Sequence, residues 1–140
     1  MQPIRKEPTL TIIVPTYNEK NNDCLPKLLK VCNELPISST EVIVIDSNSD
    51  DGSLDLIKKY EQVKCIQINE TSRAARINYG VKIAKGKLIL LHHPRCTLSK
   101  EGINHLIDSF GTFKKDTWGG FTMTFDHGHP LLKYVAWYSN

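Results

Sequence analysis

The sequence lacks any long hydrophobic run. Its longest apolar stretches, around Leu10–Val14 and Leu88–Leu91, fall far short of the roughly 20 residues that a membrane-spanning helix needs. The chain also opens without the basic start, apolar run and small-residue cleavage site of a secretory signal. These absences predict a cytoplasmic protein with no transmembrane segment.

Three other features are missing. The four cysteines, Cys24, Cys32, Cys65 and Cys96, have no C-x-x-C spacing, which favours reduced thiols. The net charge is only +3, and the basic residues are scattered among acids, so we expect no nucleic-acid partner. The motifs G-x-G-x-x-G and G-x-x-x-x-G-K-[ST] are absent, which disfavours a dinucleotide oxidoreductase or a P-loop enzyme.

What is present is a chain of 140 residues with 40% hydrophobic content, enough for one domain (1–140) with a buried core. Short runs rich in β-branched and aliphatic residues predict four strands, at Thr9–Pro15, Glu41–Asp46, Lys64–Ile68 and Lys87–His92. Between them, apolar residues recur every three or four positions and predict helices over Leu25–Leu35, Leu54–Glu61 and Ala74–Ala84. We expect Asn22 or Asp23 to cap the first helix, and Gly86 to end the third in a left-handed conformation.

The alternation of strands and helices predicts a Rossmann-like α/β fold with a largely parallel sheet and flanking helices, because each helix returns the chain across the sheet. After the fourth strand, Ser99 should cap a helix that carries Ile103, Leu106, Ile107 and Phe110. Alternating apolar residues over Trp118–Phe125 predict an irregular strand. A last helix should begin beyond Pro130, with Leu131, Leu132, Val135, Ala136 and Trp137 on its apolar side.

Ligands of such sheets bind beyond the carboxyl ends of the strands. Three loops are expected there: loop 1 (Pro15–Glu19), loop 2 (Asp46–Ser53) and loop 4 (His92–Arg95). Asp46 ends an apolar strand, where a carboxylate is costly unless something uses its charge. Two interpretations remain open: Asp46 accepts backbone N–H bonds from the turn that follows, or it binds a ligand.

Four segments in order carry a family resemblance: TIIVPTYNE, VIVIDSNSDDGS, RAARINYGVKIAKGKLILLH, and WGGF followed by HPLLKYVAW. Together they resemble glycosyltransferase family 2, most closely its small bacterial branch associated with arsenosugar-type biosynthesis. The resemblance implies the nucleotide-diphospho-sugar transferase fold called GT-A, with a nucleotide-binding half at 9–110 and the start of an acceptor-side half at 111–140. It also implies that the domain is truncated at its C-terminal end.

The implied function is transfer of a sugar from a nucleotide-sugar donor, UDP-linked, to an unknown acceptor hydroxyl, with inversion at the anomeric carbon. The alternative is a non-catalytic nucleotide-binding module or an inactive fragment of such an enzyme. The resemblance implies that loop 1 surrounds the base and ribose and that Asp46 contacts a uracil-type base. It also implies an N-x-G motif in the third helix. An arginine precedes this motif in the family, and either Arg73 or Arg76 could be that arginine here. The nucleotide-sugar site so implied comprises Pro15, Thr16, Tyr17, Glu19, Asp46, Arg73 or Arg76, and Asn78 with Gly80.

The family places a metal-binding aspartate after the fourth strand, where Mn²⁺ or Mg²⁺ would bridge the protein and the diphosphate. Here the stretch reads His92-His93-Pro94, and proline offers no ligand atom. Three outcomes stay open: His92 or His93 takes over metal binding, Arg95 neutralises the diphosphate without a metal, or the site has decayed.

No catalytic residue is predicted. The family's general base lies in a later segment, and Asp126, the nearest acid before the last helix, does not match its position. His105, His127 and His129 look ordinary. We therefore expect the chain alone not to transfer sugar, and expect the apolar side of the last helix to favour self-association.

Overall fold

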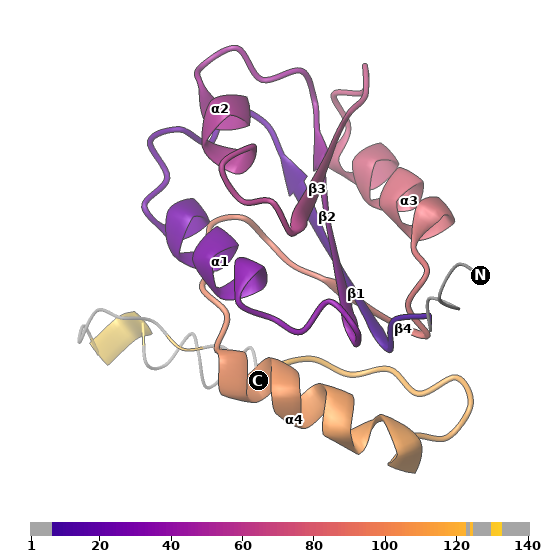
Figure 1. Ribbon diagram of the computed structural model, residues 1–140. Helices are drawn as coiled ribbons and strands as arrows, with labels where there is room; N and C mark the ends of the chain where they lie inside the picture. The colour runs from indigo at the N-terminus through magenta and orange to yellow at the C-terminus, as the bar shows by residue number, and fades with distance from the viewer. Residues whose placement is uncertain (1–6, 123, 125–129, 133–140) are drawn as a thin grey trace.

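The computed structural model describes residues 7–122, 124 and 130–132. Its centre is a four-stranded parallel sheet in the order β3-β2-β1-β4 (Figure 1). The strands are β1 (Leu10–Thr16), β2 (Thr40–Asp46), β3 (Val63–Gln67) and β4 (Leu88–Leu91). Each predicted strand is therefore present, with ends that differ from the prediction by one residue at most.

The helices are α1 (Cys24–Asn33), α2 (Ser53–Ile57), α3 (Arg73–Ile83) and α4 (Lys100–Ser109), followed by a 3₁₀ turn, η1 (Phe110–Thr112). Figure 1 shows α1 and α3 on opposite faces of the sheet, with α4 beyond its lower end. The architecture is the predicted α/β layering. None of the helices in the described residues has the length and apolar character needed to cross a bilayer.

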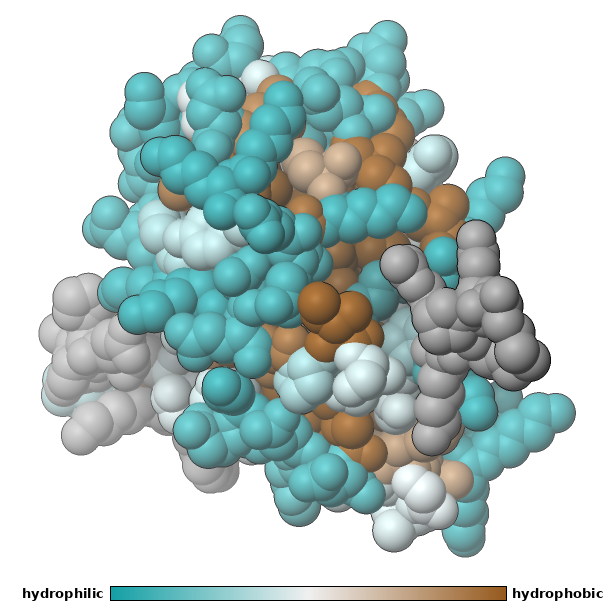
Figure 2. All heavy atoms as spheres, in the orientation of Figure 1, coloured by the Kyte–Doolittle hydropathy of each residue, from teal (hydrophilic) through white to brown (hydrophobic). Residues whose placement is uncertain are grey.

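Strand β1 lies inside the sheet, and all seven of its residues are buried. Because side chains alternate along a strand, Ile12 and Val14 pack toward α1, whereas Ile13 packs on the other face with Ile43 and Ile45. Burial on both faces explains why the run shows no apolar/polar alternation. On the face seen in Figure 2, hydrophilic residues cover most of the surface and hydrophobic ones show between them.

The helix starts follow local side-chain chemistry. Asn22 Oδ1 accepts a hydrogen bond from Cys24 N at 2.9 Å, whereas Asp23 makes no side-chain cap bond. Ser99 Oγ accepts from Gly102 N at 2.9 Å, as predicted for α4. Helix α2 is shorter than the predicted Leu54–Glu61, because after Ile57 the chain leaves the helix in a turn that leads into β3.

The prediction for Gly86 was wrong. Among the glycines that the structure describes, Gly52 has a positive φ (95°) and Gly86 does not. Helix α3 ends instead at Ala84 in an extended conformation. Gly86 is small for a different reason: a Cβ there would lie 2.4 Å from Thr11 N, so only glycine permits this close approach to β1.

The strand predicted over Trp118–Phe125 does not form within 118–122 or at 124. Alternating residues form a strand only where a neighbouring strand pairs with them, and Trp118 is 94% exposed. Met123, Phe125, Asp126, His127 and His129 lie outside the described residues. The last helix is described only at 130–132, where Leu131 is 62% exposed, and its predicted residues Val135, Ala136 and Trp137 also lie outside.

Candidate functional site at the carboxyl edge of the sheet

The strand register brings the predicted loops together. Thr16, Asp46 and Gln67 are aligned at the ends of β1, β2 and β3, so loops 1 and 2 leave the sheet side by side. Loop 4 joins them from the other flank, since His92 N donates to Ile13 O at 2.9 Å. The three loops therefore share one edge, as predicted for a parallel sheet.

Asp46 is fully buried at this edge and holds the start of loop 2. Its Oδ2 accepts from Thr16 Oγ1 and from Ser49 Oγ, each at 2.7 Å, and its Oδ1 accepts from Ser49 N at 2.7 Å. These three bonds offset the cost of removing a carboxylate from water. The turn-binding interpretation of Asp46 is therefore confirmed, whereas its direct contact with a base stays a prediction.

Loops 1 and 2 are joined by further hydrogen bonds, one between side chains and three from main chain to side chain. Asn18 and Asp50 bond reciprocally, through Asn18 Nδ2 to Asp50 Oδ1 at 3.0 Å and Asp50 N to Asn18 Oδ1 at 3.1 Å. Asn18 N donates to Ser49 Oγ at 2.9 Å, and Glu19 N donates to Ser53 Oγ at 2.7 Å. Asn18 adopts φ 50°, a left-handed conformation that asparagine tolerates better than most residues. The two loops thus form one ordered unit.

Within loop 1, Pro15 and Thr16 are buried, whereas the Tyr17 side chain is exposed. Of these three residues, Tyr17 alone presents substantial surface to a ligand. Tyr17 follows the last residue of β1 and precedes Asn18, which binds loop 2. An exposed aromatic ring is suited to stacking on a planar group.

Arg76 connects α3 to the same edge. It is only 8% exposed, and its Nη1 donates to the carbonyl oxygen of Thr16. Its Nε is buried with no hydrogen-bond partner in the described structure. Of the two competing arginines, Arg76 is therefore the one that contacts loop 1, and Arg73 lies exposed at the start of α3.

The N-x-G motif divides into two roles. Asn78 is exposed and lies about 200° around α3 from Arg76, so no described contact joins it to loops 1 or 2. Gly80 is buried against the sheet, where a Cβ would lie 2.6 Å from Ile13 Cγ2. The glycine therefore permits α3 to approach β1, and a ligand role for Asn78 stays a prediction.

Loop 4 is tied to loop 1 by contacts that the sequence did not reveal. Arg95 Nε donates to Glu19 Oε2 at 3.1 Å. Asn22 Nδ2 bridges the two loops, with Glu19 Oε2 at 3.1 Å and the Pro94 carbonyl oxygen at 2.9 Å. Glu19 is thereby held inside the loop cluster, and it orients Arg95.

The described residues offer no ready set of ligands for a divalent cation. Among the described residues, no group of three or more His, Cys, Asp or Glu side chains is arranged to hold a metal ion. His92 Nε2 donates to the Cys96 carbonyl oxygen at 3.0 Å, and His93 Nδ1 accepts from Arg95 N at 3.1 Å, so one nitrogen of each ring is engaged. Burial lowers the pKa of His92, against an opposing effect of its bond to Cys96.

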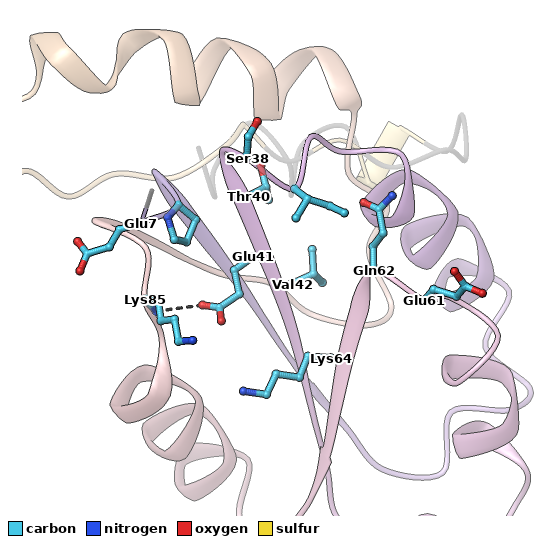
Figure 3. Close-up of a pocket in the computed structure, with 11 residues that line it drawn as sticks. Glu7, Ser38, Thr40, Glu41, Val42, Glu61, Gln62, Lys64 and Lys85 are labelled. Carbon is cyan, nitrogen blue, oxygen red and sulfur yellow. Dashed lines mark hydrogen bonds between the residues drawn. The ribbon is translucent and has the colours of Figure 1, made fainter. Parts of the chain in front are cut away.

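A hollow of about 660 Å³ lies elsewhere, near the amino ends of the strands (Figure 3). Figure 3 shows Glu41, Lys64 and Lys85 around it, with Glu41 Oε2 accepting from Lys85 N at 3.0 Å. Loops 1, 2 and 4 contribute no lining residue. We place the functional site at the loop edge rather than in this hollow, because strand-end loops carry the ligand sites of open parallel sheets.

The glycosyl transferase family 2 model matches residues 11–134 of the chain. The chain is 36% identical over 89 residues to a poly(ribitol-phosphate) beta-glucosyltransferase of Bacillus spizizenii (strain W23). This match covers 58% of this chain and 14% of that protein. Among solved structures it is similar to S. aureus TarS 1-349 in complex with UDP-GlcNAc, with a TM-score of 0.68 and 22% identity over 81% of this chain and 37% of TarS. It is also similar to the Pyrobaculum calidifontis mannosyltransferase PcManGT in complex with GDP-Man and Mn²⁺, with a TM-score of 0.60 and 21% identity over 69% and 30% of the two chains.

The chain thus spans well under half the length of each of these proteins. The structural matches confirm the predicted GT-A fold. The resemblance to the arsenosugar-type branch stays a prediction. Because the family model covers most of the chain, and the predicted motifs occupy one edge of the expected sheet, the protein belongs to glycosyl transferase family 2.

Proposed function

We propose that this chain binds a nucleotide-sugar, UDP-linked, at the edge formed by loops 1, 2 and 4, and that it supplies the donor-binding part of an inverting sugar transfer to an acceptor hydroxyl. The observation that carries the proposal is the ordered unit of loops 1 and 2 around buried Asp46, with Tyr17 exposed beside it. TarS, a structural relative, is described in complex with UDP-GlcNAc, which supports a uridine nucleotide.

In this proposal the residues of the edge have distinct roles. Tyr17 stacks on the base, since its ring is exposed. Asp46 acts by fixing loop 2, and it reaches the base only if the loops rearrange, because its carboxylate is covered. Arg76 holds the carbonyl of Thr16 and thereby positions loop 1.

The division of the domain belongs to the same proposal. Residues 9–110 form the nucleotide-binding half, and 111–140 begin the acceptor-side half, in keeping with the arsenosugar-type branch.

A non-catalytic nucleotide-binding module is the second proposal, and Pro94 favours it, because proline stands where the family has a metal-binding aspartate. Both proposals require nucleotide binding. Only the first proposal includes sugar transfer, so an assay of donor hydrolysis and sugar transfer on the full chain would distinguish the two. Self-association through the apolar residues after Pro130 remains a further expectation, to be measured by analytical ultracentrifugation.

The test of nucleotide binding is calorimetry with UDP, GDP and their sugars. We expect UDP to bind more tightly than GDP. Tyr17→Ala should weaken UDP binding by roughly 5- to 150-fold, since stacking on an aromatic ring contributes about 1–3 kcal/mol per base. Tyr17→Phe is the matched control: it keeps the ring and should retain the affinity. Equal binding by all three proteins would contradict the site.

A further inference from the structure

Arg95 is held by one side of its guanidinium and open on the other. Its Nε donates to Glu19 Oε2 at 3.1 Å, while its side chain remains 66% exposed. Glu19 is itself only 7% exposed: its N–H donates to Ser53 Oγ, and its carboxylate accepts from Asn22 Nδ2. No described residue accepts a hydrogen bond from the two terminal amino groups of Arg95. The result is an oriented guanidinium that presents two donor groups to solvent.

The surroundings of Arg95 carry positive charge. Burial lowers the pKa of neighbouring His93, and the charges of Arg73 and Arg95 lower it further, against the opposing effect of Glu19. Arg73 therefore lies near enough to loop 4 for its charge to act there. Since Glu19 offsets one positive charge, the cluster of Glu19, Arg73 and Arg95 has a net charge of about +1.

Three carboxylates of the edge accept hydrogen bonds from the loops around them. Asp46 accepts three bonds, Glu19 binds Asn22 and Arg95, and Asp51 accepts from Lys20 N at 2.8 Å and from Ser53 N at 2.9 Å. Pro94 offers only its carbonyl, which binds Asn22. A divalent cation prefers several oxygen ligands. Asp46 and Glu19 are buried and already hold the loops together, so their use as metal ligands would compete with these bonds.

Resting on the proposed function, we propose that loop 4 binds the diphosphate of the donor directly, through the open side of Arg95, so that binding does not depend on a divalent cation. A guanidinium presents its N–H groups in a fixed planar fork that matches the spacing of phosphate oxygens. Glu19 acts as a positioning residue: it holds Nε and so orients the fork toward the edge where loop 1 binds the nucleoside.

The test separates the phosphate contacts from the nucleoside contacts. The full chain, labelled with ¹⁵N, is titrated with uridine and with UDP, in EDTA and again with Mn²⁺, and binding is followed by NMR. We expect UDP to bind in EDTA more tightly than uridine. We expect Arg95→Ala to weaken UDP binding by about tenfold while leaving uridine unchanged, since a charge-assisted hydrogen bond contributes about 1.5 kcal/mol at the low end and tenfold is about 1.4 kcal/mol.

Two variants control the interpretation. Arg95→Lys keeps the charge, but one ammonium cannot hold Glu19 and present a fork to phosphate, so it should lose most of the same tenfold. Lys59→Ala removes a positive charge from the opposite edge, between α2 and β3, and should change neither ligand.

Several results would overturn the inference. UDP binding that requires Mn²⁺ would show that a metal is needed after all. An equal loss of UDP and uridine in Arg95→Ala would show a structural role, and wild-type affinity in Arg95→Lys would refute the fork. These outcomes leave nucleotide binding intact, whereas absence of binding by both uridine and UDP would refute the proposed function and this inference with it.

Discussion

Replacing Asp46 by asparagine tests whether the buried carboxylate holds the site together. The carboxylate accepts three hydrogen bonds of 2.7 Å, from Thr16 Oγ1, Ser49 Oγ and Ser49 N. Asparagine has nearly the same shape, so it leaves no cavity. It removes the charge and places an amide N–H₂ group where one acceptor oxygen was. The perturbation is therefore electrostatic and confined to the junction of loops 1 and 2.

The expected cost follows from these bonds. A hydrogen bond to a charged group contributes about 1.5–3 kcal/mol, against about 0.5–1.5 kcal/mol for a neutral one. Neutralising the acceptor should thus cost about 1 kcal/mol for each bond, less the desolvation that a neutral group avoids, for a net loss of about 2 kcal/mol in the free energy of unfolding. Asp46→Ala should cost more, roughly 3–5 kcal/mol, because it leaves the buried Ser49 N–H without an acceptor.

The assay is urea unfolding followed by circular dichroism, with UDP titration of the folded variants. Asp50→Asn is the control, because Asp50 is an exposed acid of the same loop, and its loss should cost well under 1 kcal/mol. The reasoning fails if Asp46→Asn is as stable as wild type or only as perturbed as Asp50→Asn. It also fails if Asp46→Asn loses stability but binds UDP with unchanged affinity.

Other predictions concern stability and thiol chemistry. Because burial lowers the pKa of His92, the unfolded chain binds a proton that the folded chain does not, so the free energy of unfolding should fall as the pH drops below 6.5, and His92→Gln should reduce that slope in urea titrations. Gly86→Ala should destabilise the fold by roughly 2 kcal/mol or more in the same assay, since its Cβ would lie 2.4 Å from a backbone nitrogen, whereas Gly111→Ala, with nothing within 4 Å, should be nearly neutral. A thiol reagent should label exposed Cys96 quickly in the native protein and Cys32 only on unfolding, because burial raises the pKa of Cys32 to about 12; equal labelling rates would contradict the structure.

The sequence predicted the sheet well because its signals are local. Each strand is a short run rich in β-branched and aliphatic residues, and the helices between the strands fix parallel pairing. The shared edge of loops 1, 2 and 4 then follows from topology alone. The apolar face of α1 was also predicted correctly. Its residues recur at helical spacing, and all of them are buried: Leu25, Leu28, Leu29 and Cys32.

What could not be predicted depends on contacts between distant parts of the chain. Gly86 looked like a helix stop, yet its smallness serves an approach to Thr11, 75 residues away. Glu19 and Arg95 pair across 76 residues, and no spacing rule links them. The alternation around Trp118 predicted a strand, but pairing requires a neighbour that local sequence does not reveal.

The role of Asp46 also could not be decided from the sequence. The sequence identified it as a charged residue at the end of a buried strand and left two interpretations open. Only the positions of Thr16 and Ser49 decided that its carboxylate is used inside the protein. The carboxylate thus organises loops 1 and 2, and its contact with a base stays a prediction.

The most direct test of the account is where UDP binds. In a ¹⁵N NMR titration of the full chain, we expect UDP to shift the amide signals of Tyr17, Ser47 and Arg95, at the carboxyl edge of the sheet, and to leave those of Glu41 and Lys64 unchanged. Shifts that gather instead on Glu41 and Lys64, around the hollow at the opposite edge, would place the ligand site there. That result, or the absence of any shift, would contradict the central claim that loops 1, 2 and 4 form a nucleotide-sugar site.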